Sequence, residues 1–346
     1  MNTTDAIYIP NAPAIAGLTF RRFRGAEDYP KMVGVSLASA EADQIERVAT
    51  VEDVANTYAH LVNSDPYQDM IFAEVDDEVV GYSRGLWRQG EDGVRLYELF
   101  GFLAPAWRRK GIGETMLRWM EARLQSIAGA HSALETGLLE IYVQADHTGL
   151  AAMVENNDYR PVRYFVEMVR PDLEDIPDFS LPQGLEVRPV LPEHYRPIWD
   201  AHEEAFRDHW GYAAATEADY QSWLENKTIF QPGLWQIAWD TGTHEIAGQV
   251  RTFINAAENE KYNRKRGYTE FISVRRPWRK RGLARALIAL SLRLQKELGM
   301  TESALGADSE NTSGATRIYE DCGFHVTKRD ALYRKPIKAV VVEVRS

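Results

Sequence analysis

The chain contains Trp278-Arg279-Lys280-Arg281-Gly282-Leu283-Ala284, and 171 residues earlier it contains the closely similar Trp107-Arg108-Arg109-Lys110-Gly111-Ile112-Gly113. Other pairs of segments keep the same order. Gly81–Arg84 matches Gly248–Arg251 at a spacing of 167 residues, and residues 149–159 match residues 314–324 at a spacing of 165. Self-similarity over a fixed period indicates repeated structural units. We therefore expect two copies of one fold in tandem.

The length of the chain agrees with this division. At 346 residues the chain is longer than one hydrophobic core usually serves. Residues 171–178 form an acidic segment bounded by prolines, which is typical of a linker. We place the domains at 1–177 and 178–346. In each of them segments rich in β-formers, such as 70–75 and 234–239, alternate with helical stretches, which predicts a layered α/β fold.

The repeated glycine motif lies at a predicted strand-to-helix junction. Residues 268–274 are rich in aromatic and β-branched residues and are expected to form a strand. After each motif the apolar spacing becomes helical, so these apolar positions are expected to face the core. They are Ile112, Met116, Met120, Leu124 and Ile127 in the first copy, and Leu283, Leu287, Leu290, Leu294 and Leu298 in the second.

A glycine at such a junction suits the binding of a pyrophosphate. It lets the backbone approach a ligand, and the unpaired N–H groups of the first helical turn then face that ligand. A solvated basic turn would explain one isolated motif, but its occurrence twice in the same context favours a binding loop. The loop lacks the Gly-Lys-Ser/Thr ending and the three-glycine fingerprint, which argues against ATP and NAD.

The two glycine loops resemble the acyl-CoA pyrophosphate loop of the GNAT superfamily of acyltransferases, Gln/Arg-x-x-Gly-x-Gly/Ala. Residues 311–324 resemble its second motif, Asn-x-x-x-Ala-x-x-x-Tyr-x-x-x-Gly-Phe. The resemblance covers nearly the whole chain. It implies two GNAT-like domains, each with a mixed, mostly antiparallel sheet flanked by helices, in an arrangement similar to that of mycothiol synthases. It also implies acetyl-CoA as acyl donor and no metal.

The resemblance assigns roles in the second copy. Tyr319 would protonate the departing CoA thiolate, because a phenol is neutral at pH 7 and can donate a proton. Glu270 would be the general base, although an exposed strand carboxylate or a chain of water molecules is an alternative. The cofactor-binding residues would be Ile272, Ser273, Val274, Arg279, Lys280, Arg281, Gly282, Leu283, Ala284 and Asn311.

The first copy departs from this pattern. Val154 aligns with Tyr319 and cannot donate a proton, and Asp146 and Asp158 replace the motif's asparagine and glycine. Glu98 holds a position comparable to that of Glu270. We expect a structural or residual cofactor-binding role for this domain, through Arg108, Arg109, Lys110, Gly111, Ile112 and Gly113.

The acceptor site is less clearly marked. Residues 205–212 follow the first helix of the second domain, where the superfamily usually borders its acceptor site. Asp208, His209 and Trp210 could contact an amine there, and packing is the alternative because aromatic clusters are most often core.

Composition excludes several other classes. The net charge of −11 argues against nucleic-acid binding and favours a cationic small substrate. No apolar run approaches the length that crosses a bilayer. Cys322 is the only cysteine, which fits a reducing, cytoplasmic location. His202-Glu203-Glu204 begins like a zinc-protease helix, but Phe206 stands where the second histidine is needed.

The sequence thus predicts transfer of an acetyl group from acetyl-CoA to a primary amine of a small molecule, by direct attack. Two alternatives remain at this stage: acylation of a protein or peptide amine, and a non-catalytic acyl-CoA sensor. The acceptor, the acyl chain length and the oligomeric state are left open.

Overall fold

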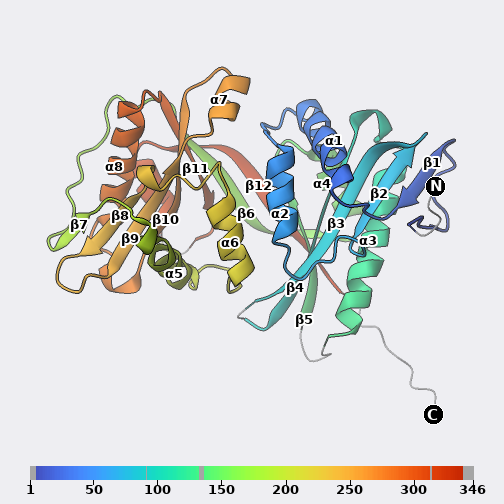
Figure 1. Ribbon diagram of the computed structural model, residues 1–346, viewed down its shortest axis with the longest axis horizontal. Coiled ribbons are helices and arrows are strands. Elements are labelled where there is room, and N and C mark those ends of the chain that lie inside the picture. Colours follow the sequence, from blue (N-terminus) through green and yellow to red (C-terminus); the bar gives the residue numbers. More distant parts are fainter. Residues whose placement is uncertain (1–4, 91, 132–135, 312–313, 338–346) are drawn as a thin grey trace, which may run out of the picture. The chain divides into compact units, whose positions relative to one another are not determined.

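The computed structural model describes residues 5–90, 92–131, 136–311 and 314–337 (Figure 1). The chain forms two compact units. Unit 1 comprises residues 1–162 and 331–346, and unit 2 comprises residues 163–330. The division differs from the predicted boundary at 177/178. Residues 165–170, from the first half of the sequence, form a strand of unit 2, and residues 331–336, from the second half, form a strand of unit 1. A division at a single point in the sequence therefore cannot describe the two units.

Unit 1 has the strand order β1-β2-β3-β4-β5-β12. The β4–β5 pair is parallel, and the other pairs with recorded register are antiparallel. Residues 331–336 of β12 supply the strand beside β5. The elements are β1 (Leu18–Arg21), α1 (Tyr29–Ala42), α2 (Val51–Ala59), β2 (Met70–Val75), β3 (Glu78–Gln89), β4 (Val94–Leu103), α3 (Ile112–Gly129), β5 (Thr136–Val143), α4 (Thr148–Asn156) and the end of β12 (His325–Pro336).

Unit 2 repeats this order as β7-β8-β9-β10-β11-β6, again with one parallel pair, β10–β11. Residues 165–170 of β6 supply the strand beside β11. The elements are β6 (Arg160–Arg170), β7 (Leu185–Val187), α5 (Tyr195–Phe206), α6 (Glu217–Glu225), β8 (Gln236–Asp240), β9 (Ile246–Phe253), α7 (Ala256–Lys261), β10 (Arg266–Val274), α8 (Leu283–Glu297), β11 (Glu302–Asp308) and α9 (Ala315–Asp321). The expected layered fold with a mixed, mostly antiparallel sheet is confirmed in both units.

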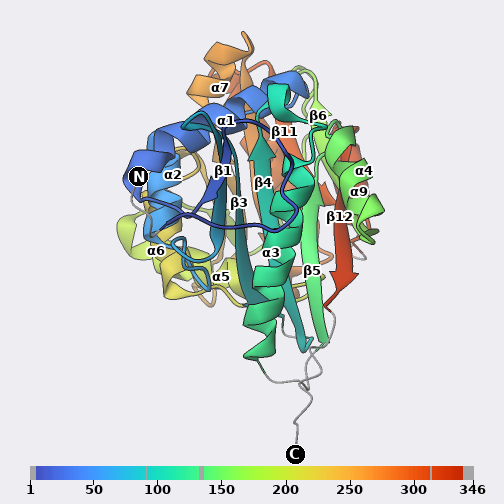
Figure 2. The same cartoon turned by 90° about the vertical axis from the view of Figure 1, so that its right-hand side faces the viewer.

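The sheet of unit 1 is packed on both faces. Helix α3 lies across one face, as Figure 2 shows, and a Cβ on Gly85 of β3 would come within 3 Å of Met120 and Leu124 of that helix. Tyr82 on the same strand faces the opposite core, which contains Met32 of α1. This alternation follows from the two-residue period of a strand.

Unit 2 has the same two cores. Helices α8 and α9 cover one face, and α5 and α6 cover the other. The predicted α8 stripe is correct at Leu283 and Leu287 but wrong at its end, because Leu298 lies beyond the helix and is 45% exposed. Ile288 and Leu292, which the predicted stripe omits, are fully buried, so the buried face of α8 extends beyond that stripe.

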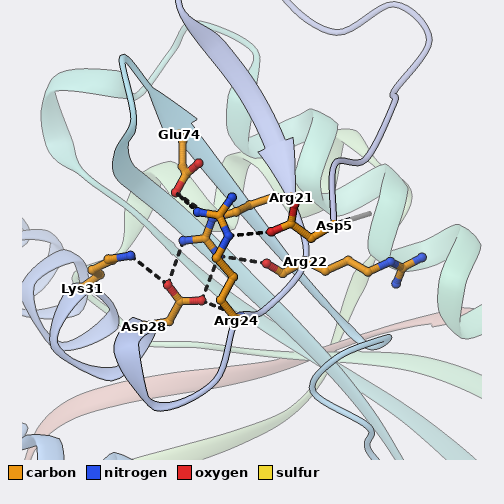
Figure 3. Close-up of polar contacts among 7 residues, drawn as sticks. All are labelled: Asp5, Arg21, Arg22, Arg24, Asp28, Lys31 and Glu74. Atoms are coloured by element: carbon orange, nitrogen blue, oxygen red, sulfur yellow. Dashed lines mark hydrogen bonds and ion pairs between the residues drawn. The ribbon is translucent and has the colours of Figure 1, made fainter. Parts of the chain in front are cut away.

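A buried ionic cluster joins β1 to the start of α1 in unit 1 (Figure 3). The Arg21 guanidinium is 2% exposed and donates to both carboxylate oxygens of Asp28 at 2.8 Å and to Glu74 at 2.6 Å. Asp28 also accepts the backbone N–H of Arg24. Arg188, its counterpart in the repeat, pairs with Glu186 in a more exposed setting. Buried ion pairs therefore fix the start of the first helix in unit 1, whereas the corresponding arginine of unit 2 makes a more exposed pair.

Candidate active site

The glycine loop of unit 2 leads directly into helix α8. Gly282 is the N-cap of the helix in a left-handed conformation with φ 86°, and Lys280 also has a positive φ of 60°. The first-turn N–H groups of a helix have no intrahelical acceptor, so they remain available to a ligand. A Cβ at Gly282 would meet no atom of the described residues within 4 Å. The loop is thus open and has the backbone donors that an anionic diphosphate requires.

The basic side chains of this loop have different roles. Arg279 points back into the unit and donates to the Val274 carbonyl at 2.9 Å and to the Ala205 carbonyl at 3.1 Å. Lys280 and Arg281 are more exposed, although Arg281 donates to the Gln183 carbonyl at 3.2 Å. Arg279 therefore braces the loop, and the positive charge available to a ligand comes from its neighbours.

Asp208 is the ionic partner of the loop. Its carboxylate binds Arg276 and Arg279, the latter at 2.5 Å, and hydrogen bonds from these two arginines lower its pKa from the ordinary value. The sequence analysis placed Asp208 near the acceptor. The structure places its carboxylate on the loop instead, at the C-terminal end of helix α5.

Strands β10 and β11 separate beside this loop. Their parallel pairing covers Arg266–Tyr268 and Glu302–Ala304. On its other edge β10 continues to pair with β9 through Ser273 and Val274, after a bulge at which Phe271 has φ 51°. Among the described residues, the edge of β10 that carries Ile272–Val274 has no recorded ladder partner on β11. This edge is compatible with the expectation that Ile272, Ser273 and Val274 bind the cofactor.

Glu270 lies where the two strands part. Its carboxylate accepts the backbone N–H of Gly306 on β11 at 2.7 Å. Burial raises the pKa of Glu270 to about 7, against the opposing effect of that hydrogen bond. A carboxylate with a pKa near neutrality is suited to accept a proton at physiological pH.

Tyr319 lies on helix α9 in the same unit and is 8% exposed. Burial raises its pKa above the ordinary value, and the charge of Glu270 raises it further, so the two groups interact electrostatically. Within the described residues the hydroxyl has no hydrogen-bond partner. Asn311 lies in the turn before α9, where its carbonyl accepts the Gly314 N–H at 3.4 Å. Thr312 and Ser313 of the same motif lie outside the described residues.

His209 and Trp210 pack in different environments. The His209 ring stacks on Phe206, with 4.1 Å between the ring centroids, and the centroids of Phe206 and His202 are 4.0 Å apart. The His202 centroid lies 5.9 Å from that of Phe271, the residue at the bulge. Burial lowers the pKa of His209. Trp210 lies under the guanidinium of Arg163 at 5.1 Å. The rings thus connect the loop after α5 with the strand that carries Glu270.

Unit 1 has a loop of the same backbone form. Arg109 and Gly111 have φ values of 58° and 84°, and Gly111 is the N-cap of α3. Its surroundings differ, because a Cβ on Gly111 would lie 3.0 Å from Pro13. Val154, which aligns with the tyrosine of unit 2, is completely buried in the core.

The expected equivalence of Glu98 and Glu270 is wrong. Arg84 and Arg251 correspond in the repeat. In the strand ladders Arg84 lies opposite Phe100, and Arg251 lies opposite Glu270. Phe100 therefore stands where unit 2 has its carboxylate. The bulge in β10 adds one residue that β4 lacks, so counting back 12 residues from each motif glycine matches Glu270 with Leu99 instead of Phe100, and Glu98 lies one residue farther still.

Three neighbours of Glu270 were not identified from the sequence as site residues: Arg251, His202 and Phe271. Arg251 had a signal, since it ends the repeated Gly-x-x-Arg segment. Phe271 had none, because nothing in its segment marks a bulge. In the described part of the chain, no group of three or more histidine, cysteine or acidic residues is placed to hold a metal ion. The helices described there include none long and apolar enough to cross a membrane.

Comparison with known proteins agrees with this geometry. The family model of the acetyltransferase (GNAT) family matches residues 36–148 and 195–324. The chain belongs to the GNAT acetyltransferase family. Each GNAT match lies mainly in one of the two units, so the tandem arrangement predicted from the repeat is confirmed, and the chain is an acyltransferase of a family that uses acyl-CoA.

Several known proteins are similar to this chain. Mycothiol acetyltransferase of Salinispora tropica is 30% identical over 64% of this chain and 67% of its own length. The enzyme of that name from Geodermatophilus obscurus is 25% identical over 78% of this chain and 82% of its own. A GCN5-related N-acetyltransferase from Sphaerobacter thermophilus superposes with a TM-score of 0.69 at 27% identity, covering 96% and 98% of the two chains. A tandem GNAT protein from the clavulanic acid biosynthesis pathway has the same fold, with a TM-score of 0.63 at 18% identity and coverage of 93% and 99%.

Proposed function

We propose that this GNAT protein transfers an acetyl group from acetyl-CoA to a primary amine of a small molecule, and that unit 2 carries out the reaction. The observation that carries the proposal is Glu270, which lies at the point where β10 and β11 part, bonded to Gly306 and within electrostatic reach of Tyr319. A base, an acid and an open phosphate loop are thereby combined in one unit.

The proposed chemistry uses these two side chains directly. Glu270 accepts a proton from the incoming ammonium, which then attacks as a neutral amine. Tyr319 donates its hydroxyl proton to the departing sulfur. Acetyl-CoA supplies the acetyl group and the thiolate leaving group, and no covalent enzyme intermediate is needed. The backbone of Ile272–Val274 and the loop from Arg279 to Ala284 would hold the pantetheine arm and the diphosphate.

We propose a different role for unit 1, that of a catalytically degenerate copy. Val154 offers no proton, Phe100 offers no base, and Pro13 lies against the glycine loop. A small-molecule acceptor is supported by the mycothiol acetyltransferase relatives, although their acceptor is not assigned to this chain. A reducing, cytoplasmic location remains part of the proposal, since the only cysteine is a buried thiol.

A calorimetric titration with acetyl-CoA tests this assignment. The two variants Gly282→Glu and Gly111→Glu carry the same backbone strain, because both glycines have φ near 85°, and at Gly111 the added Cβ also lies 3.0 Å from Pro13. The glutamate at either position would repel a diphosphate. We expect Gly282→Glu alone to abolish binding. No binding to the wild type, or loss of binding only in Gly111→Glu, would contradict the proposal. Binding without release of CoA over a broad amine panel would favour the sensor alternative.

A further inference from the structure

Arg251 on β9 is a buried cation without a counter-ion. The side chain is 2% exposed, and its Nε and Nη1 atoms have no hydrogen-bond partner among the described residues. The guanidinium carbon lies 4.2 Å from the ring centroid of Phe271 and 5.2 Å from that of Trp223. Aromatic faces offset part of the lost hydration, but a buried charge whose donors lack acceptors remains unfavourable.

Within the described residues, the acidic residue opposite Arg251 in the sheet makes no ion pair with it. Glu270 is directly opposite in the antiparallel β9–β10 ladder. Side chains at such positions lie close enough to interact. The carboxylate of Glu270 turns instead to the N–H of Gly306 on β11, and no ion pair with Arg251 is recorded within the described residues. An acidic and a basic residue are thus opposite each other in the ladder, and their side chains have different contacts.

The other charged neighbours do not neutralise Arg251 either. Glu203 exerts an attractive effect on it, but its carboxylate is occupied by the Tyr212 hydroxyl at 3.1 Å and the Ala215 N–H at 3.2 Å. His202 is buried with no partner for Nδ1, and burial, followed by the charge of Arg251, keeps its pKa well below the ordinary value. His202 is therefore a neutral ring at pH 7, and Glu203, the anion that acts on Arg251 from a distance, makes no ion pair with it within the described residues.

We propose that Arg251 binds a carboxylate of the acceptor, so that the substrate is a small amine bearing a carboxylate close to its amino group, as in an amino acid. The inference rests on the proposed function, because it takes Glu270 as the group that receives the ammonium. Opposite positions in one ladder bring the two residues to the same place on the sheet, where one small ligand can contact both side chains. A guanidinium–carboxylate contact is a strong, charge-assisted interaction, and it supplies the acceptors that Nε and Nη1 lack.

Unit 1 provides a matched control. Arg84 occupies the corresponding place in the repeat, 8% exposed, with its guanidinium 5.0 Å from the rings of both Tyr58 and Phe100. Its Nε and Nη1 atoms likewise have no partner among the described residues. Phe100 stands opposite it in place of a carboxylate. Arg84→Met therefore removes an equally buried cation from a unit without the proposed base.

The first experiment compares amino acids with their amides as acceptors, measuring CoA release for the wild type, Arg251→Met and Arg84→Met. The members of each pair differ in the charge of the carboxyl group. We expect kcat/KM in the wild type to be at least about tenfold higher for the acid, as the loss of a charged hydrogen bond implies. The preference should vanish in Arg251→Met and persist in Arg84→Met. A wild type that accepts amides equally well, or an Arg251→Met variant that keeps the preference, overturns the proposal.

A binding measurement decides the matter if no acceptor in the panel is turned over. Glycine, alanine and serine are used as probes, and their effect on the melting temperature is compared between wild type and variants. A shift seen in the wild type and Arg84→Met but absent in Arg251→Met supports the site, and no shift in the wild type rejects it. If Arg251→Met fails to fold, Arg251→Lys, which retains the cation, should keep part of the preference for acids, and its complete loss or an unchanged preference refutes the proposed contact geometry. Failure of acetyl-CoA to bind would reject the proposed function separately.

Discussion

Asp208 holds Arg279 with an Oδ2–Nη1 distance of 2.5 Å, and Asp43 holds Arg108 in the same way in unit 1, at 2.6 Å. Each aspartate follows the first helix of its unit, and each arginine begins a glycine loop. The arginines also donate to strand carbonyls, of Val274 and of Leu103. The two units thus use one ionic contact to fix the loop against the helix, whether or not the unit is proposed to react.

This contact predicts that the single substitution Asp208→Ala weakens the binding of acetyl-CoA. Arg279 and Arg276 would lose their acceptor, and the loop would become less ordered. We expect the dissociation constant for acetyl-CoA to rise by about tenfold, corresponding to roughly 1.4 kcal/mol. Calorimetric titration measures it, with Asp43→Ala as the control that should leave binding unchanged. An Asp208→Ala variant with normal acetyl-CoA affinity and a raised KM for the amine would show that Asp208 acts on the acceptor after all.

The raised pKa of Glu270 predicts a pH dependence of catalysis. The base is active when ionised, so kcat/KM should rise with pH and level off above about pH 7, where the pKa of this carboxyl lies. Glu270→Gln should remove this rise and lower the rate. The measurement is a rate profile from pH 5.5 to 9, and a wild-type profile without a transition in this range would contradict the assignment.

Ionisation of Glu270 should favour catalysis but lower the stability of the fold. A carboxyl whose pKa is raised from its ordinary 4.5 to about 7 binds its proton more tightly in the folded state. It therefore destabilises the fold progressively as pH rises from about 4.5 to 7. Glu270→Gln should raise the melting temperature at pH 8 relative to the wild type and have a smaller effect at pH 5. An equal effect at both pH values would mean that the burial of this carboxyl does not perturb its titration.

Tyr319→Phe should separate chemistry from binding. The hydroxyl has no hydrogen-bond partner in the described residues, so its removal should leave the melting temperature and the acetyl-CoA affinity close to those of the wild type. Loss of a general acid lowers turnover by about 10²–10⁴-fold. Steady-state kinetics combined with titration tests this prediction. A variant that retains wild-type kcat would exclude Tyr319 as the acid.

Arg21→Met should destabilise unit 1 strongly. It removes the buried cation shared by Asp28, which is fully buried, and Glu74, which is 4% exposed, and leaves them with the more exposed Lys31 and Arg24. Breaking one side of a buried ion pair costs about 3–5 kcal/mol. Urea denaturation measures the loss, and Arg188→Met at the corresponding place in unit 2 should change stability by less than about 1 kcal/mol, as for exposed pairs. Equal effects of the two substitutions would refute this reading of the cluster.

Much of the fold could be predicted from residue patterns. The repeat indicated two copies, and strand β2 was predicted with the bounds that the structure gives it. The glycine of each loop was identified because a left-handed N-cap favours that residue type, and both Gly111 and Gly282 have this conformation. These features are local: they depend on the conformational preferences of a few consecutive residues.

Other features depended on contacts between distant parts of the chain. Strand β6 pairs with β11 of unit 2, and the end of β12 pairs with β5 of unit 1. These pairings join residues far apart in the sequence, so the local composition does not indicate them. The bulge at Phe271 shifts the register of β10 by one residue, so the counterpart of Glu270 in unit 1, Phe100, cannot be found by counting back from the glycine motif.

The sequence alone was sufficient for the family, the repeat and the left-handed glycine that begins α3 and α8, since short motifs specify these features. The partners of individual side chains required the folded chain. Asp208 was a candidate contact of the acceptor, and the folded chain shows its carboxylate bound to the loop. Arg251 attracted no role, and within the described part of the chain it makes no ion pair with Glu270, its partner in the ladder. Charge pairing and burial depend on which residues the sheet and helices bring together, and those distances are set by tertiary packing.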